Sequence, residues 1–220
     1  MNAVMTTRSL VQPLPAVLDS HPPFSLLHRR KNIGDYRPTS ADLARFNQLL
    51  ARLGRKQPPL DIDRLATAAR QLATGTDTEG NAPGCIAERI TWIESVAAMA
   101  GDPDWQAANE AADCARLVVA YADDTHDLIP DWLPQVGRLD DAIVVEAAWP
   151  MLRDEVACHR DFRRLRALEA SLRGCTPAEL PFDRHAWKVA REAEAALVAH
   201  RRRVRESSYV PAPTPVFRVH

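Results

Sequence analysis

Several residue types are scarce in this chain of 220 residues, and each scarcity argues against a class of protein. Aromatic residues make up only 6% of the chain, and no alternating β-branched run is bounded by turn residues, so β-strands are not predicted. The four cysteines form no CxxC pair, which fits reduced thiols better than a disulfide framework. The eight glycines complete neither a GxGxxG nor a GxxxxGKS or GxxxxGKT pattern, so no phosphate-binding loop is predicted.

Long apolar runs are missing as well. No stretch approaches the about 18 apolar residues that a membrane-spanning helix needs. Near the N-terminus, Pro13 and Pro15 interrupt the apolar stretch that follows Arg8, which is not typical of an export signal. We therefore predict a cytoplasmic protein without a membrane span.

The abundant residues favour helices. Alanine, leucine, arginine and glutamate are all common in the chain and are all strong helix formers. Apolar residues recur at helical spacing in six stretches that are separated by glycine, proline or capping residues. These stretches cover residues 40–53, 61–75, 85–100, 103–122, 140–172 and 183–205. We predict an all-α fold, an irregular bundle of six or seven helices with extended termini.

Capping residues and prolines set the expected helix boundaries. Ser40 and Asp61 are suited to N-cap the first two helices. Asp102 followed by Pro103 predicts the start of the fourth helix, because proline is favoured at the first helical position. Pro150 lies inside the fifth stretch and has no N–H to donate to the preceding turn, so we expect a kink or a break there.

Three segments are expected along the chain. Residues 1–38 are proline-rich and are predicted to form an extended N-terminal arm, which packs on the body through apolar residues that include Phe24 and Leu27. Residues 39–206 are predicted to form the helical domain. Residues 207–220 contain three further prolines and are predicted to be a disordered tail.

Charge is distributed unevenly, although the net charge is only −1. Residues 101–155 carry 3 basic and 13 acidic groups, whereas residues 156–220 carry 13 basic and 7 acidic groups. Such blocks either pair within the fold or mark a cation site and an anionic partner. The near-neutral total argues against a nucleic-acid partner, and no aromatic residue interleaves the cluster Arg201–Arg205. A peripheral contact of this cluster with an anionic membrane stays open.

One acidic, proline-punctuated segment, residues 127–139, stands apart from the helical pattern. Pro130 and Pro134 end the preceding helix and predict a tight turn. The apolar residues of this turn have no helical period, and we expect them to plug the gap between two antiparallel helices. They are Leu128, Ile129, Trp132, Leu133 and Val136. The segment is therefore predicted to connect a helical hairpin.

Four aspartates lie at the two ends of this connection. Asp127, Asp131, Asp140 and Asp141 fall within 15 residues of one another. A connection that folds back brings several of these carboxylates together. Asp140 or Asp141 is also suited to cap the following helix, and Gly137 is suited to a positive φ angle.

These blocks carry a resemblance to a known family. The sequence DLIPD at Asp127–Asp131, followed by the GxLDD pattern of Gly137 and Leu139–Asp141, resembles the motif of the YkvA-like bacterial proteins, which are defined by a short domain of unknown function. The resemblance covers residues 115–152, under a fifth of the chain. It implies a helical structure and, because many members have strongly apolar helices beside the motif, membrane association. It implies no activity.

The chain departs from the family pattern on both sides of the motif. Before it stand Asp123–His126, where the family more often has a small or apolar residue followed by Ser-Pro. After it, Glu146, Pro150 and Arg153 interrupt a helix that is usually apolar. Both departures weaken the implied membrane association for this chain.

Two functional hypotheses follow. The first is a non-enzymatic helical interaction or scaffolding protein with a protein partner. The alternative is a divalent-cation-binding protein, extended to a metal-dependent hydrolase, because clustered carboxylates suit Mg²⁺, Mn²⁺ or Ca²⁺ and two such ions support phosphoester hydrolysis. Its ligands would be Asp127, Asp131, Asp140 and Asp141, with His126 nearby.

The same aspartates have an ordinary structural interpretation. Aspartate commonly caps helices, and arginines such as Arg116 and Arg138 are available for ion pairs. The chain has no GxSxG or HExxH pattern, so no catalytic residue is predicted. We therefore prefer the interaction hypothesis to the enzymatic one.

Overall fold

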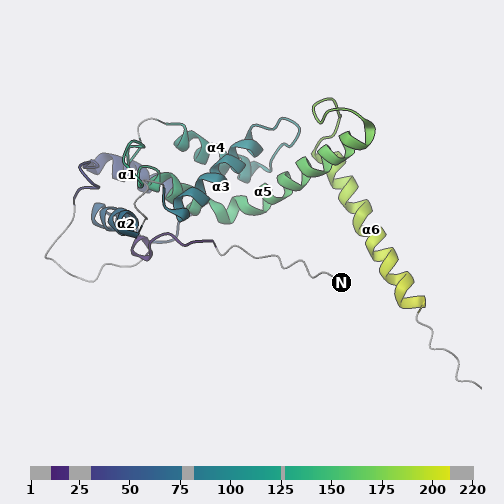
Figure 1. Ribbon diagram of the computed structural model, residues 1–220, viewed down its shortest axis with the longest axis horizontal. Coiled ribbons are helices and arrows are strands. Elements are labelled where there is room, and N and C mark those ends of the chain that lie inside the picture. Colours follow the sequence, from purple (N-terminus) through teal and green to yellow (C-terminus); the bar gives the residue numbers. More distant parts are fainter. Residues whose placement is uncertain (1–10, 20–30, 76–81, 125–126, 209–220) are drawn as a thin grey trace, which may run out of the picture. The chain divides into compact units, whose positions relative to one another are not determined.

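The computed structural model describes residues 11–19, 31–75, 82–124 and 127–208. Within these ranges every regular element is a helix, so the all-α prediction is confirmed (Figure 1). A short 3-10 helix, η1 (Ala16–Leu18), precedes six α-helices. These are α1 (Ser40–Arg52), α2 (Ile62–Gly75), α3 (Gly84–Ala100), α4 (Asn109–Ala122), α5 (Leu139–Arg173) and α6 (Arg184–Ser208).

The chain forms two compact units, Met1–His159 and Arg160–His220. The division falls inside α5, whose first part belongs to the first unit and whose last part belongs to the second. It also falls within residues 39–206, which we had predicted as one helical domain.

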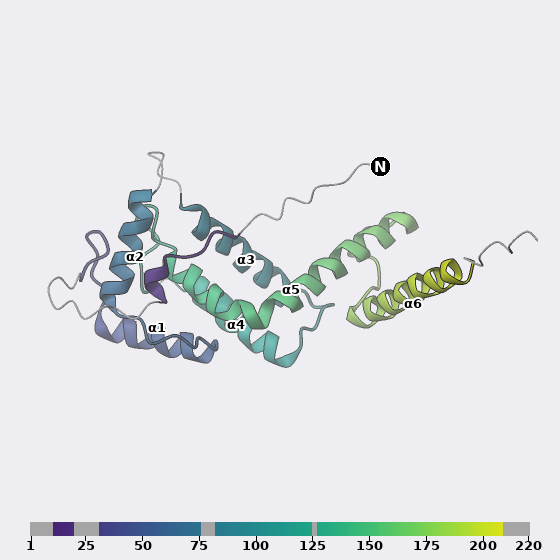
Figure 2. The same cartoon turned by 90° about the horizontal axis from the view of Figure 1, so that it is seen from below.

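The first unit contains the main hydrophobic core. Helix α3 packs against α4, and α2 packs against η1. The first part of α5 lies beside α3 and α4 in both views (Figures 1 and 2). Each α-helix of this unit contributes apolar side chains that are almost completely buried: Leu50, Leu65, Ile86, Met99, Val118, Leu139 and Ile143. The apolar stripes predicted from the sequence therefore face a common core.

Part of the predicted N-terminal arm is described, and it packs on this unit. Leu18 of η1 is buried. The buried guanidinium of Arg89 in α3 donates a hydrogen bond of 2.7 Å to the carbonyl of Gln12. Phe24 and Leu27, through which we expected the arm to pack, lie outside the described residues. Arg55, which follows α1, holds the other end of this segment by donating a hydrogen bond of 2.8 Å to the Leu18 carbonyl, so arginines fasten the arm at two points.

The first two helices begin as capping chemistry dictates. Helix α1 is capped by Thr39 rather than by Ser40, because the Thr39 hydroxyl accepts a hydrogen bond of 3.1 Å from the Asp42 N–H. Helix α2 is capped by Asp61 as predicted, since its carboxylate accepts a hydrogen bond of 2.8 Å from the Arg64 N–H.

Helix α4 begins later than predicted. Asp102 and Pro103 start only a single turn, which the Trp105 N–H closes by donating to the Asp102 carbonyl at 3.2 Å. Gln106 then takes a φ of 48°, a left-handed conformation that no helix continues through, and α4 starts at Asn109. The proline start signal was therefore wrong for the helix. The turn has a packing role, because it buries the whole Trp105 side chain.

Helix α5 continues through Pro150, so the break that we allowed for does not occur. Proline removes one helical hydrogen bond, the one to the carbonyl of Glu146. Ala148 and Leu152 lie on either side of the proline and are completely buried. Packing of these flanking residues offsets the lost bond and keeps the helix continuous.

The second unit is built around a few aromatic and charged side chains. The rings of Phe162 and Phe182 stack with their centroids 5.6 Å apart. The indole N–H of Trp187 in α6 donates a hydrogen bond of 2.9 Å to the carboxylate of Asp161. Beyond this anchor, every side chain from Glu192 to Glu206 is exposed. Most of α6 therefore has no apolar cover from the described residues of its own unit.

The C-terminal end of α6 overlaps the predicted tail. The helix reaches Ser208, so the first two residues of the segment 207–220 are helical. Residues 209–220, which we predicted to be disordered, lie outside the described part of the chain.

Candidate functional site

The connection between α4 and α5 forms a compact plug, residues 127–139. Four of the five apolar residues predicted to fill it are buried, and Leu139 at the start of α5 is buried with them. Trp132 is the exception, since 70% of this residue is exposed. Its neighbour Leu133 is buried instead.

Gly137 is required by a close backbone approach rather than by a positive φ angle. A Cβ atom at this position would lie 2.4 Å from the carbonyl oxygen of Asp131, a distance that real Cβ atoms do not tolerate. The positive φ that we expected at Gly137 occurs instead at Gln135, with a value of 66°. The two ends of the plug thus touch through their backbones, which ties the DLIPD block to the GxLDD block.

Asp140 connects the plug to both of its flanking helices. Its buried carboxylate accepts hydrogen bonds from the Tyr121 hydroxyl at 2.7 Å and from the Ile129 N–H at 2.9 Å. The Tyr121 oxygen in turn accepts a hydrogen bond of 3.2 Å from the Leu128 N–H. Asp140 therefore does not cap α5 but lies in its first turn, where the helix dipole favours a negative charge.

Asp141 is held by a neighbouring arginine. Its carboxylate accepts a hydrogen bond of 3.0 Å from the Nε of Arg138, as the ion-pair interpretation predicted. Arg116, the other arginine considered for this role, pairs instead with Asp113 one turn earlier in α4. The second of two adjacent aspartates is therefore neutralised locally.

Burial raises the pKa of the carboxyls around the plug. Desolvation, opposed by hydrogen bonds from Tyr121 and Ile129, raises the pKa of Asp140 to about 7. Desolvation also raises the pKa of Asp141 and of Asp127, each to about 6. One oxygen of each of these three carboxyls is buried and has no hydrogen-bond partner among the described residues. The site therefore favours protonated carboxyls more than ordinary surface aspartates do.

The plug lines two different cavities. The first has a volume of about 540 Å³ and is acidic, because Asp127, Asp131 and Asp42 lie along it together with Pro130 and Trp132. It gathers carboxylates of the DLIPD block with one from α1. Among the predicted ligands, Asp127 and Asp131 reach this cavity, whereas Asp140 and Asp141 are buried at the start of α5.

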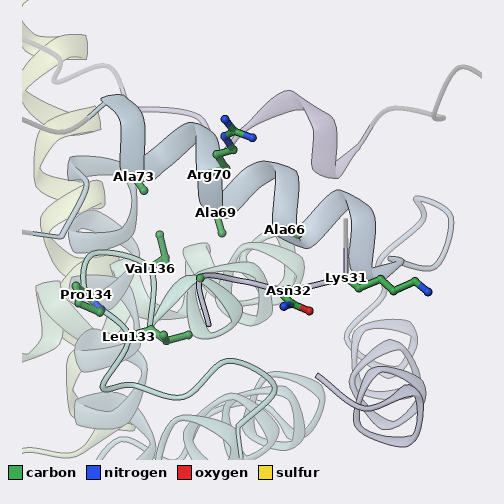
Figure 3. Close-up of a pocket in the computed structure, with 10 residues that line it drawn as sticks. Lys31, Asn32, Ala66, Ala69, Arg70, Ala73, Leu133, Pro134 and Val136 are labelled. Carbon is green, nitrogen blue, oxygen red and sulfur yellow. The ribbon is translucent and has the colours of Figure 1, made fainter. Parts of the chain in front are cut away.

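The second cavity has a volume of about 700 Å³ and is mainly apolar (Figure 3). Helix α2 contributes alanines to one wall, and the plug contributes Leu133, Pro134 and Val136 to the other. Ala69 and Val136 point toward one another, whereas the side chain of Arg70 points away from the cavity. The plug thus separates an acidic surface from an apolar one.

The cation hypothesis needs at least three suitable side chains around one point. Within the described ranges, no group of three or more histidine, cysteine, aspartate or glutamate side chains is arranged to hold a metal ion. His126, which we considered as a nearby ligand, lies outside those ranges. Asp127 and Asp131 line one cavity. Asp140 and Asp141 do not join them there, because Asp140 binds Tyr121 and Ile129 and Asp141 binds Arg138.

Sequence reasoning missed two residues of this site. Tyr121 supplies the hydroxyl that orients Asp140, and it lies one turn after the buried Val118 of α4. That spacing places it on the core-facing side of the helix, so the apolar period could have found it. Tyr36 also lines the acidic cavity, and no local sequence signal points to it.

Comparisons of the chain with family models, with curated proteins and with solved structures find no match. Among the helices of the described part, none combines the length and the apolar character that crossing a bilayer requires. The functional conclusion therefore rests on the geometry of this chain and on the motif resemblance.

Proposed function

We propose that this protein is a non-enzymatic helical interaction protein of the YkvA-like type, and that α6 is the helix that binds its protein partner. The observation that carries the proposal is the exposure of apolar residues along α6. Leu197 and Val204 lie two turns apart on one face of the helix, and each exposes 48% of its surface. An exposed apolar face on a helix commonly marks a contact with another protein.

The residues of the DLIPD and GxLDD blocks support this proposal because their contacts hold the α4–α5 connection together. The Asp140 carboxylate binds both the Tyr121 hydroxyl and the Ile129 N–H, and Gly137 allows the close backbone approach to Asp131. Contacts of this kind stabilise the helical scaffold. The resemblance to the YkvA-like family implies a helical structure and implies no reaction.

Photo-crosslinking tests the proposed docking role. A photoreactive amino acid is placed at Leu197 on the apolar face, and in a matched control at Ala195, which is exposed on the other side of α6. We expect a protein adduct from position 197 and none from position 195 when the full chain is irradiated in its native cells. Equal labelling from both positions, or none from either, would sink the proposal.

The cation-binding alternative rests on the buried carboxyl oxygens of Asp127, Asp140 and Asp141 that have no described partner. Thermal melts in EDTA and then in Mg²⁺, Mn²⁺ or Ca²⁺ decide it. A cation that binds only the folded state adds about 2.7 kcal/mol of stability at about 100 times its Kd. A shift of this kind that disappears in the double variant Asp140→Asn, Asp141→Asn would favour the alternative over the interaction role.

A further inference from the structure

The apolar face of α6 has a regular spacing. Leu197 and Val204 lie seven residues apart, and Ala190 lies a further seven residues toward the N-terminus. Ala193 lies between Ala190 and Leu197, and His200 takes the equivalent position between Leu197 and Val204, so the stripe contains four apolar residues and one histidine. Leu197 and Val204 each expose 48% of their surface. The spacing is that of a helix that packs lengthwise against a second helix.

Charged residues beside this stripe follow the same spacing with opposite signs. Glu194 and Arg201 are also seven residues apart, so they lie on the same side of the stripe, two turns from each other. Glu194 pairs within α6 with Arg191. No ion pair of Arg201 is found in the described part of the chain, although its neighbour Arg202 pairs with Glu206 at 2.8 Å.

Resting on the proposed docking role of α6, we infer that the partner of this face is α6 of a second copy of the chain, packed in the antiparallel direction. In that direction, Glu194 of one copy faces Arg201 of the other, and two-fold symmetry repeats the contact. Flanking charges of opposite sign determine the orientation of paired helices in this way. A parallel arrangement would instead gather the two Arg201–Arg205 clusters at one end.

Charge reversal of the full-length chain tests this inference. The dimer dissociation constant is measured by sedimentation velocity over a range of concentrations. Glu194→Arg places arginine opposite arginine twice, and Arg201→Glu places glutamate opposite glutamate twice, so each change is expected to raise the constant by about tenfold or more. The double variant restores opposite charges and should return to within about threefold of the original value.

Two controls accompany these variants. Glu192→Arg makes the same charge change as Glu194→Arg on the far side of α6, and it should leave the dissociation constant unchanged. Leu197→Glu places a charge in the stripe and should leave only monomer. Circular dichroism confirms that each variant keeps its helical content, so that a loss of dimer is not a loss of folding.

Three results would overturn the inference. The first is a monomer at all concentrations, and the second is a double variant whose dissociation constant is as high as those of the single variants. The third is Arg201-dependent binding to vesicles of phosphatidylglycerol and phosphatidylcholine in place of dimerisation. The photo-crosslinking described above separates this failure from that of the proposed function. A monomer that still forms an adduct with a different protein through Leu197 keeps the docking role. A monomer without any adduct loses both.

Discussion

The two units of this protein differ in how many apolar side chains their helices bury. In the first unit, buried side chains come from every helix, and even the arginine Arg89 is only 1% exposed. In the described part of the second unit, only three apolar residues are buried: Phe162, Ala170 and Leu180. Six large apolar residues of the same part are exposed, among them Leu172 at 75%.

The contrast lies in how far tertiary packing supports the helices of each unit. A helix in water is marginal by propensity alone and gains most of its stability from packing an apolar face. The helices of the first unit have that packing within the chain. Helix α6 has intrahelical ion pairs such as Arg202–Glu206, which contribute about 0.3–0.5 kcal/mol each. Its apolar face therefore gains most from a partner.

The largest effect is expected for Gly137→Ala in the first unit. The added Cβ would lie 2.4 Å from the Asp131 carbonyl oxygen, so the plug backbone must shift. We expect a loss of about 3–4 kcal/mol in the free energy of unfolding, measured by urea denaturation. The matched control is Gly75→Ala, where no atom of the described residues, apart from the chain neighbours and the helix's own backbone, lies within 4 Å of the new Cβ. A comparable loss in both variants would contradict the close-approach argument.

A somewhat smaller loss is expected when the buried cation of the first unit is removed. Arg89 donates to Glu146 at 2.7 Å, to the Gln12 carbonyl at 2.7 Å and to the Cys85 carbonyl at 3.0 Å. Arg89→Met keeps the volume and leaves these acceptors without their donor. We expect a loss of about 2–3 kcal/mol and faster amide hydrogen exchange at Gln12. If exchange there is unchanged, Arg89 does not hold the arm.

The buried carboxyls predict a stability that falls as the pH rises. Aspartate in an unfolded chain has a pKa near 3.9, whereas burial raises the pKa of Asp140 to about 7 in the folded protein. Between these values the folded state binds more protons than the unfolded state, so the free energy of unfolding decreases from about pH 4 to about pH 7. Denaturation at several pH values measures this decrease.

A pair of variants assigns that pH dependence. Asp140→Asn keeps an oxygen that accepts from Tyr121 and Ile129 but cannot ionise, so it should remove much of the slope. Asp131→Asn changes an exposed carboxylate of the same motif, whose charge acts on Asp127 and Asp141 and not on Asp140, so it should change the slope much less. A slope that survives Asp140→Asn would place the titrating group elsewhere.

The smallest effect is expected for an exposed ion pair of the second unit. Arg173 donates to Glu169 at 2.6 Å one turn away in α5, and the arginine side chain is 59% exposed. Arg173→Met should change the free energy of unfolding by less than about 0.5 kcal/mol, in contrast with Arg89→Met. Differential scanning calorimetry of the two variants side by side measures the difference. Equal effects would remove the distinction between the units.

The fold was predictable because its evidence is local. Apolar spacing and caps such as Asp61 indicated the helices, and DLIPD with GxLDD indicated a tight hairpin connection. Local evidence failed where tertiary packing overrode a local signal. The Asp102–Pro103 start signal was overridden by the burial of Trp105, and the break at Pro150 was overridden by packing on both of its sides.

The sequence by itself determined the helices, their apolar stripes and the separation of acidic from basic regions, since these depend on neighbours within a few turns. Only the tertiary structure decided what holds each of the two buried aspartates at the start of α5. Asp140 and Asp141 are adjacent and chemically identical, yet one accepts from Tyr121, 19 residues away, and the other from Arg138, three residues away. It also decided that Gly137 avoids a backbone clash and that the stripe of α6 is left uncovered. Such outcomes depend on contacts between distant segments, which residue spacing does not encode.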